Sequence, residues 1–361
     1  MAGTDTRNSP TMSCPPTQTT PLRFDEAWYQ RVIELHGYHR LGVRPIDFTL
    51  PGANVQSLAT RWLCHDDGDR FAELVQANHE TCIVTTGIGL SGDPHIGTLS
   101  QMLRAIFLQR CGLRVQFVLG DLDSYNARGK SLTELVERAE QYRLFIEALG
   151  FDSSAGILRT QRRHPEILET AYLIARCLND KDFRDAKEDL SDLYEHHGVH
   201  DGMSFPIKQS ILLMVADFVH LGWRDHATGV LVSLGIEEHM YVRLARAVVQ
   251  RMGLGFMVAG MYSPLVNGLG GFPKMSKSIP ESSIYVSEDP ASIRRKIVDE
   301  ESPFTHPGDS VVLQMMAATS LDAEYRLPEW GAVAAAGGAA WRALKSNFAD
   351  ELVELCSRWS A

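Results

Sequence analysis

"CIVTTGIGLSGDPHIGTLSQMLRAIFLQRCGLRVQFVLGD", residues 82–121, contains two apolar runs separated by a glycine-rich turn and a long amphipathic segment. The runs at 82–87 and 115–121 are short and apolar, the first of them β-branched, which is typical of buried parallel strands. Between them, apolar residues recur at helical spacing until Gly112, a common helix stop. This stretch therefore predicts strand, helix and strand, the repeating unit of an α/β fold.

The same alternation continues along the chain. Residues 131–150 predict a helix that opens with a capping box of Ser131 and Glu134. Residues 229–235 predict another buried strand, which leads into a helix over 240–253. We therefore predict an α/β fold with a doubly wound parallel sheet, a Rossmann-like nucleotide-binding domain, and a small helical domain at the C-terminus.

Composition limits the possible functions. The chain has 361 residues, a formal net charge of −10 and a pI near 5.7. These values argue against a protein that binds through a broad basic surface. Six cysteines occur without a close pair, which predicts reduced cysteines in a cytoplasmic protein and no metal site. The most apolar stretch, 210–223, is too short to span a membrane and contains Asp217 and His220.

The turn after the first predicted strand contains Gly87, Gly89 and Gly92 at the G-x-G-x-x-G spacing of dinucleotide-binding folds. The predicted helix does not begin inside this glycine run, and no acidic residue closes the second strand about twenty residues later. The pattern therefore argues against NAD or NADP. His95 instead lies where the strand leads into a helix N-terminus, a position that attracts phosphate.

A second segment, "GGFPKMSKSIP" at 270–280, carries Lys274 and Lys277 between glycines and prolines that disfavour regular structure. We call it the lysine loop. A solvated turn is one interpretation of this loop taken alone. Together with His95, its two lysines describe a site for nucleotidyl transfer with pyrophosphate as the leaving group, a reaction that depends on positioning and charge stabilisation.

These motifs resemble a known family. "PHIGT" and "KMSKS" are similar to the two signatures of class I aminoacyl-tRNA synthetases, and "TGIGLSGDPHIG", "GDLDSY", "SFPIKQ" and "GIEEHMYVRLAR" resemble segments of the tryptophanyl/tyrosyl subgroup. The resemblance covers about residues 65–300. The segment before the first strand is most similar to archaeal and eukaryotic tryptophanyl-tRNA synthetases.

The resemblance implies an ATP-dependent ligase that uses Mg²⁺, forms an aminoacyl-adenylate and passes the aminoacyl group to tRNA. It implies tryptophan, or another apolar or aromatic amino acid, as the substrate and a homodimer as the assembly. The implied catalytic residues are His95, Lys274 and Lys277. The implied ATP-binding residues are Gly87, Gly89, Gly97, Thr98, Gly235, Glu237, Met275, Ser276 and Ser278. The implied amino-acid-binding residues are Thr85, Asp123, Gln209 and Glu238.

Composition predicts that residues 1–22 are disordered, and short helical patterns predict a helical lead-in over 23–80. The resemblance implies the organisation of the rest of the chain. Residues 81–285 form the synthetase catalytic domain, with a helical insertion at about 164–222. Residues 286–361 form a reduced, anticodon-binding-like helical domain.

Several positions depart from the family pattern. Thr98 replaces the last histidine of the first signature, Thr85 stands where an aromatic residue is common, and Val118 replaces a polar residue. Residues 302–361 carry four Lys/Arg against seven Asp/Glu, which is unfavourable for binding RNA phosphates. An alternative is therefore a synthetase-like ligase that transfers its amino acid to a small molecule, peptide or carrier protein. A third hypothesis is a non-catalytic binding or regulatory relative, against which the intact "KMSKS" argues.

Overall fold

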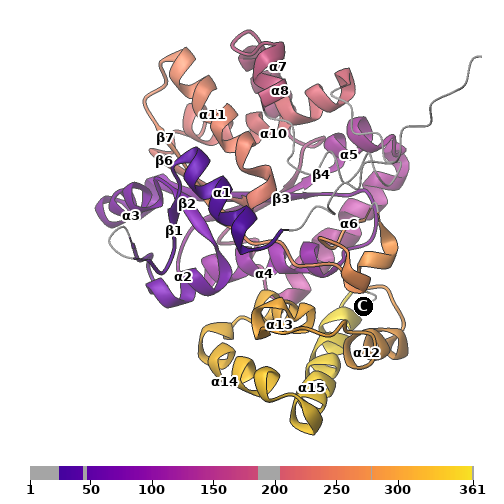
Figure 1. Cartoon of the computed structure of the whole chain (residues 1–361). Helices are drawn as coiled ribbons and strands as arrows, with labels where there is room; N and C mark the ends of the chain where they lie inside the picture. Colours follow the sequence, from indigo (N-terminus) through magenta and orange to yellow (C-terminus); the bar gives the residue numbers. More distant parts are fainter. Residues whose placement is uncertain (1–23, 44–46, 186–203, 278, 360–361) are drawn as a thin grey trace, which may run out of the picture.

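The computed structural model describes residues 24–43, 47–185, 204–277 and 279–359. A seven-stranded sheet forms its centre, and helices pack on both faces of that sheet (Figure 1). The strand order is β1-β2-β7-β6-β3-β4-β5. The strands are β1 (His39–Arg40), β2 (Cys64–Asp66), β3 (Cys82–Gly89), β4 (Val115–Gly120), β5 (Ile157–Thr160), β6 (Gly229–Gly235) and β7 (Met257–Ser263).

The connections of the sheet create one topological switch point. β3 pairs in parallel with β4 on one side and with β6 on the other, and β5 and β7 extend the two halves in parallel. β1 and β2 add an antiparallel edge next to β7. The chain therefore moves from β3 outward through β4 and β5, and then returns to the other side of β3. Ligands of doubly wound folds bind at the carboxyl ends of the strands at such a point, which here is between β3 and β6.

The helices fall into groups along the chain. The lead-in contributes α1 (Glu26–His36), α2 (Val55–Arg61) and α3 (Gly68–Ala77). The central domain adds α4 (Ile96–Arg110), α5 (Asp121–Arg128), α6 (Leu132–Leu149), α7 (Pro165–Ala175), α8 (Asp180–Asp185), α10 (Phe205–Trp223) and α11 (His239–Met252). The C-terminal group, below the sheet in Figure 1, is α12 (Pro290–Val298), α13 (Val311–Thr319), α14 (Ala323–Ala336) and α15 (Gly338–Ser357).

Two apolar clusters cover the two faces of the sheet. One contains residues of α4 and α6 and continues into the C-terminal helices, and the other contains residues of α1, α7, α10 and α11. Adjacent residues of β3 contribute to opposite clusters, because side chains alternate along a strand: Ile83 packs with α10, and Val84 with α4. This double burial explains why the central strands read as continuous apolar runs rather than as alternating ones.

The α/β fold class, the parallel sheet and the C-terminal helices are confirmed. The hydroxyl of Ser131 caps α6 as predicted, since it accepts the backbone N–H of Glu134 at 3.2 Å. The lead-in differs from its helical prediction because it also contains β1 and β2, which have two and three residues and are too short to produce a periodic pattern. α5 and β5 were not predicted either. The proposed disordered segment 1–22 and part of the proposed insertion, 186–203, lie outside the described residues.

Within the described part of the chain, no helix combines the length and the apolar character needed to cross a membrane. The longest apolar helix, α10, instead packs against α5, α7 and α11. Most of its side chains from Ser210 to Leu221 are buried among protein neighbours, and the helix forms one wall of the candidate site.

Two helical glycines allow a direct test of packing around α10. A Cβ atom at Gly222 would overlap the ring of Phe256, whereas a Cβ at Gly331 in α14 would meet no atom within 4 Å. We expect Gly222→Ala to reduce the free energy of unfolding by about 1–3 kcal/mol through overpacking. Gly331→Ala is the matched control, expected to be neutral or to stabilise by up to about 1 kcal/mol because alanine favours a helix. Urea denaturation measures both, and equal effects would contradict the packing described here.

Candidate active site

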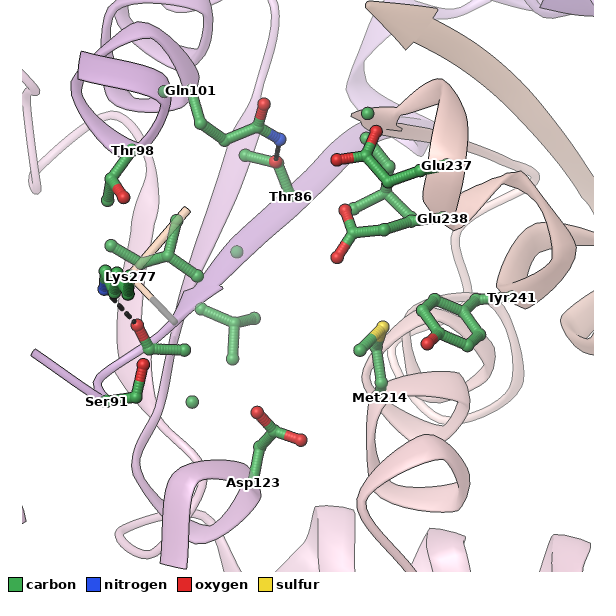
Figure 2. A pocket seen from close by; sticks show the side chains of 18 of the residues that line it. Thr86, Ser91, Thr98, Gln101, Asp123, Met214, Glu237, Glu238, Tyr241 and Lys277 are labelled. Atoms are coloured by element: carbon green, nitrogen blue, oxygen red, sulfur yellow. Dashed lines mark hydrogen bonds between the residues drawn. The ribbon is translucent and has the colours of Figure 1, made fainter. Parts of the chain in front are cut away.

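A pocket of about 530 Å³ opens at the switch point between β3 and β6. Its walls come from the turn after β3, the start of α4, the first turn of α5, the middle of α10 and the lysine loop. In Figure 2, Ser91 and Lys277 lie on one side of the pocket, Met214 and Tyr241 lie opposite them, and Asp123 lies between. Parallel strands that end on both sides of the switch point thus bring distant segments of the chain together.

His95 is the N-cap residue of α4. Its Nδ1 accepts the backbone N–H of Gly97 at 3.0 Å and that of Thr98 at 3.4 Å. Burial, and next the charges of Lys277 and Lys274, lower the pKa of His95 to about 3. The imidazole is therefore neutral, and because Nδ1 is an acceptor its proton is on Nε2. His95 thus presents one N–H donor at a helix N-terminus.

Glycines keep the backbone accessible on both sides of the pocket. A Cβ at Gly97 would lie 2.8 Å from Cε1 of His95, so a side chain here would displace the ring from its capping position. A Cβ at Gly235, where β6 ends, would overlap the carboxylate of Glu237. Both positions line the pocket, and the absence of a side chain lets a flat ligand approach the main chain closely.

The two lysines of the lysine loop contact opposite walls of the pocket, one wall each. The Nζ of Lys277 donates to the carbonyl oxygens of Gly89 at 3.0 Å and Gly92 at 3.4 Å, in the turn after β3. The Nζ of Lys274 lies 3.5 Å from Oε1 of Glu237. Burial is the largest cause that lowers the pKa of Lys277 to about 7, and nearby Arg138 adds to it. The loop thus places cations against both halves of the site.

The loop itself is fixed by its backbone. The N–H of Met275 donates to the carbonyl of Val266 at 3.0 Å, and the N–H of Ser276 donates to the hydroxyl of Ser282 at 3.0 Å. Gly270 and Gly271 have φ values of +64° and +83°, a region that favours glycine, so they supply the turn into the loop. These contacts hold the two lysines over the pocket although the segment lacks a long helix or strand.

Two charged residues that line the pocket, one in α4 and one after β6, each have a side-chain atom without a hydrogen-bond partner in the described part of the chain. Among the described residues, the buried Nε of Arg104 and the buried Oε2 of Glu237 have no hydrogen-bond partner. Both residues line the pocket. Burial lowers the pKa of Arg104 to about 10, and Glu237 opposes this. Because buried polar atoms are nearly always paired, this donor and this acceptor indicate a polar ligand at this end of the pocket.

The other end of the pocket is more apolar, with a charged floor. Met214 and Tyr241 point into it from α10 and α11 (Figure 2), and Val118 of β4 lies in the wall. Below them, Asp217 of α10 is 2% exposed and also lines the pocket. This end offers apolar contact along its sides and carboxylate oxygens at its base.

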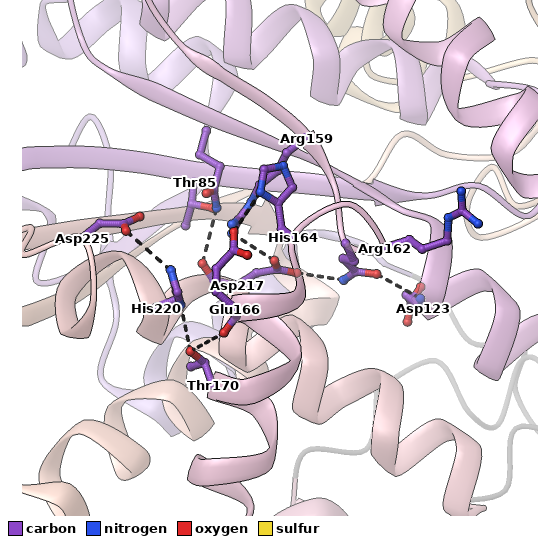
Figure 3. Close-up of polar contacts among 12 residues, drawn as sticks. Thr85, Asp123, Arg159, Arg162, His164, Glu166, Thr170, Asp217, His220 and Asp225 are labelled. Carbon is purple, nitrogen blue, oxygen red and sulfur yellow. Dashed lines mark hydrogen bonds and ion pairs between the residues drawn. The ribbon is translucent and has the colours of Figure 1, made fainter.

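Asp217 belongs to a buried polar network (Figure 3). Its carboxylate accepts from Nη2 of Arg159 at 3.1 Å and from Nε2 of Gln161 at 2.8 Å. The Oε1 of Gln161 in turn accepts the backbone N–H of Asp123 at 3.0 Å. Burial raises the pKa of Asp217 to about 6, and Arg159 opposes this shift. The network connects β5, α5 and α10 beneath the pocket.

Most residues implied by the sequence line this one pocket. They are His95, Lys274, Lys277, Gly87, Gly89, Gly97, Thr98, Gly235, Glu237, Met275, Ser276, Asp123 and Glu238. Ser278 lies outside the described residues.

Two implied residues do not reach the pocket. Thr85 is 0% exposed and does not line the pocket, and its hydroxyl accepts from Nε2 of Gln116 at 2.8 Å. Gln209 lies on the exposed face of α10. Met214, further along the same helix, faces the pocket instead. A motif match identifies a position in the chain, whereas the rotation of the helix decides which side chain points inward.

The sequence interpretation missed Arg104, Gln161, Met214 and Tyr241, and it did not assign Asp217 to the site. Asp217 had a usable signal, because a charged residue inside an otherwise apolar helix needs a buried partner. Arg104 had the same signal, since it lies in the apolar helix after the glycine-rich turn. Gln161 had no local signal, because its role depends on β5 lying beside β4.

Comparison with known proteins identifies the family of this chain. A family profile described as "tRNA synthetases class I (W and Y)" matches residues 77–300. The tryptophan–tRNA ligase of Aeropyrum pernix is 27% identical over 284 residues, which are 73% of this chain and 72% of that protein. The crystal structure of the tryptophanyl-tRNA synthetase from A. pernix superposes with a TM-score of 0.71 and 20% identity, covering 93% of this chain and 94% of that one.

The match to other relatives is shorter. The tryptophan–tRNA ligase of Thermoplasma acidophilum is 29% identical over 185 residues, which are 50% of this chain and 41% of that protein. For tryptophan–tRNA ligase 1 of Halobacterium salinarum the matched part is 34% of its length. The chain thus spans less than half the length of these two curated relatives.

The ion pair of Asp217 and Arg159 gives a stability prediction. Asp217→Asn leaves the buried guanidinium of Arg159 without a charged partner and is expected to cost about 3–5 kcal/mol of unfolding free energy. Replacing both residues, as in Arg159→Met with Asp217→Leu, is expected to recover most of this loss. The control is Asp225→Asn, because the carboxylate of Asp225 is 47% exposed and lies 3.5 Å from Nε2 of His220. This change should cost less than about 1 kcal/mol. Equal effects of Asp217→Asn and Asp225→Asn in urea denaturation would contradict the network.

Proposed function

Because this chain belongs to the class I tRNA synthetases of the tryptophanyl and tyrosyl group, we propose that it activates an amino acid with ATP and transfers it to tRNA. The observation that carries the proposal is the convergence of His95 and the lysine loop on one pocket. The pocket joins a site suited to phosphates with a mainly apolar end that has a carboxylate floor. This combination fits a reaction between a triphosphate and the carboxylate of an amino acid.

The residues present fit ATP. The N-terminus of α4, the imidazole Nε2–H of His95 and the ammonium of Lys277 face the region where phosphates would lie. Gly97 and Gly235 leave room for the adenosine, and the unpaired Oε2 of Glu237 can accept a ribose hydroxyl. The unpaired Nε of Arg104 supplies a donor beside it.

Mg²⁺ is proposed to enter with the nucleotide. No group of three or more His, Cys, Asp and Glu side chains in the described ranges is arranged to hold a metal ion. Mg²⁺ commonly binds through substrate phosphates and one or two carboxylates. When bound, the ion neutralises part of the triphosphate charge.

The proposed activation step is a nucleophilic displacement at the α-phosphorus of ATP. One carboxylate oxygen of the amino acid attacks the α-phosphorus of ATP, and the bond from that phosphorus to the bridging oxygen breaks, so that pyrophosphate leaves with the bonding electrons. Negative charge grows on the departing oxygens. Neutral His95 donates its Nε2–H to this charge, and Lys277 and Lys274 place cations beside it. The enzyme supplies no nucleophile of its own.

The amino-acid end supports tryptophan as the substrate. Met214, Tyr241 and Val118 offer apolar contact for a large side chain. The carboxylate of Asp217, held by Gln161, offers an acceptor at the floor for a donor such as an indole N–H. Glu238 is proposed to lie near the ammonium of the substrate, and Asp123 is proposed to contact its side chain.

The assembly is proposed to be a homodimer in the cytoplasm. Exposed apolar side chains lie on two adjacent helices of the insertion: Leu168 and Tyr172 of α7 are 41% and 82% exposed, and Phe205 of α10 is 71% exposed. A second copy of the chain would cover them. The five cysteines within the described residues are free, as expected in a reducing compartment.

Tyr172→Asp tests the dimer. Analytical ultracentrifugation is expected to give twice the chain mass of 40.2 kDa for the natural chain and a monomer for the variant, because a charge in an apolar interface opposes association. Tyr325→Asp, on the exposed face of α14, is the control and should leave the mass unchanged. A monomeric natural chain would refute the dimer.

Exchange of labelled pyrophosphate into ATP, measured with each amino acid in turn, tests the proposed activation. We expect exchange with tryptophan, followed by charging of total tRNA with the same amino acid. Lys277→Ala should lower the exchange rate by about 100-fold or more, since it removes a donor to developing charge. Lys181→Ala, at an exposed position of α8, should not change this rate.

Three outcomes would count against parts of this proposal. Absence of exchange with every amino acid would refute the activation step. Exchange without tRNA charging would show that the activated amino acid is passed to an acceptor other than tRNA. An unchanged rate in Lys277→Ala would refute the role given to the lysine loop.

A further inference from the structure

The hydroxyl of Tyr142 is the third acceptor of Lys277, at 3.0 Å from its Nζ. Tyr142 lies on α6, outside the pocket, and is 0% exposed. Its own O–H donates to the carbonyl of Gly92 at 2.7 Å. Since that proton is used on Gly92, the hydroxyl accepts from Lys277. The ammonium thus has three donors and three acceptors: this hydroxyl and the carbonyls of Gly89 and Gly92.

The end of the chain packs against the same tyrosine. The ring of Trp359, just past α15, lies edge-on to the ring of Tyr142 with centroids 5.1 Å apart and an interplanar angle of 81°. It makes a similar contact with Phe145 at 5.2 Å and 84°. Trp359 is 6% exposed. A continuous stack of contacts therefore leads from the C-terminal helices through Tyr142 to Lys277.

We infer that Tyr142 is a positioning residue for Lys277 and that Trp359 holds Tyr142 in the required place. The site is thereby supported from the C-terminal helices. This inference rests on the proposed function for its meaning in catalysis, whereas the contacts themselves do not depend on which substrate is used.

The chemistry of the contact explains why a tyrosine is suited to this position. Phosphate oxygens entering the pocket would compete with the carbonyls of Gly89 and Gly92 for the ammonium. Tyr142 does not line the pocket, so its hydroxyl can retain one hydrogen bond to Lys277 while the other two exchange. Phenylalanine would remove this acceptor and would also leave the carbonyl of Gly92 without its donor.

Titration of Lys277 in the full-length chain tests the inference without any substrate. The chain is labelled with an amine-acylating reagent across a pH series, and the fraction of Lys277 modified is measured by peptide mass spectrometry. In Tyr142→Phe the midpoint of labelling is expected to move to lower pH by about one unit, because the charged form loses a hydrogen bond. The other charged or titratable groups around Lys277 are unchanged by this variant: Arg138, Asp93, Arg128, His95 and Lys274.

Two further variants complete the experiment. Trp359→Leu should move the midpoint in the same direction by a smaller amount. Tyr285→Phe is the matched control, because its ring contacts His95 at 6.3 Å between centroids and its half-buried hydroxyl has no hydrogen bond to Lys277 among the described residues. It should leave the midpoint unchanged. In an unfolded variant the labelling midpoint of Lys277 would instead move to higher pH, toward the pKa of an exposed lysine.

Pyrophosphate exchange then connects the contact to catalysis. Tyr142→Phe should lower kcat by about 10-fold with a KM for the amino acid within about twofold, and the alkaline limb of kcat/KM for ATP should move to lower pH. A midpoint of Lys277 that is unchanged in folded Tyr142→Phe would overturn the inference. Failure of exchange in the natural chain, with the labelling shift present, would refute the proposed function and leave the positioning contact intact.

Discussion

The hydrogen bond from the backbone N–H of Gly97 to Nδ1 of His95 determines how the site works. It satisfies a donor that every helix N-terminus leaves unpaired, and it fixes the imidazole as a neutral ring with its proton on Nε2. His95 therefore both caps the N-terminus of α4 and presents a hydrogen-bond donor to the pocket. The glycine at 97 is required for this arrangement, because a Cβ would collide with the ring. The sheet determines where His95 lies, because the turn that carries it follows β3 at the switch point beside β6.

The cations of the lysine loop complement this neutral donor. In the described conformation Lys277 is held by main-chain carbonyls and a tyrosine hydroxyl, and Lys274 lies beside Glu237. Burial disfavours the charged form of Lys277, which is why its pKa falls toward neutrality. A triphosphate would replace weak neutral acceptors by charged ones and would favour the ammonium again. Binding of the nucleotide and organisation of the loop are therefore coupled through the same hydrogen bonds.

Much of this site could be predicted from the sequence, because residues 82–121 and the lysine loop carry their signals locally. A glycine-rich turn before a helix and two lysines among glycines and prolines have few other physical explanations when they occur together. The rest depends on contacts between distant segments. Arg159 of β5 and Asp217 of α10 are 58 residues apart and meet only in the folded chain, and Gln209 faces outward because of the rotation of α10. Similarly, nothing in the sequence places Trp359 against Tyr142.

A crystal structure of this chain with a non-hydrolysable ATP analogue would show directly where the triphosphate binds. We expect a triphosphate between the N-terminus of α4 and the lysine loop, with phosphate oxygens within hydrogen-bonding distance of Nε2 of His95 and Nζ of Lys277. Lys277 should then have left the carbonyls of Gly89 and Gly92. A nucleotide bound away from His95, or phosphates that contact neither lysine of the loop, would refute the proposed phosphate site.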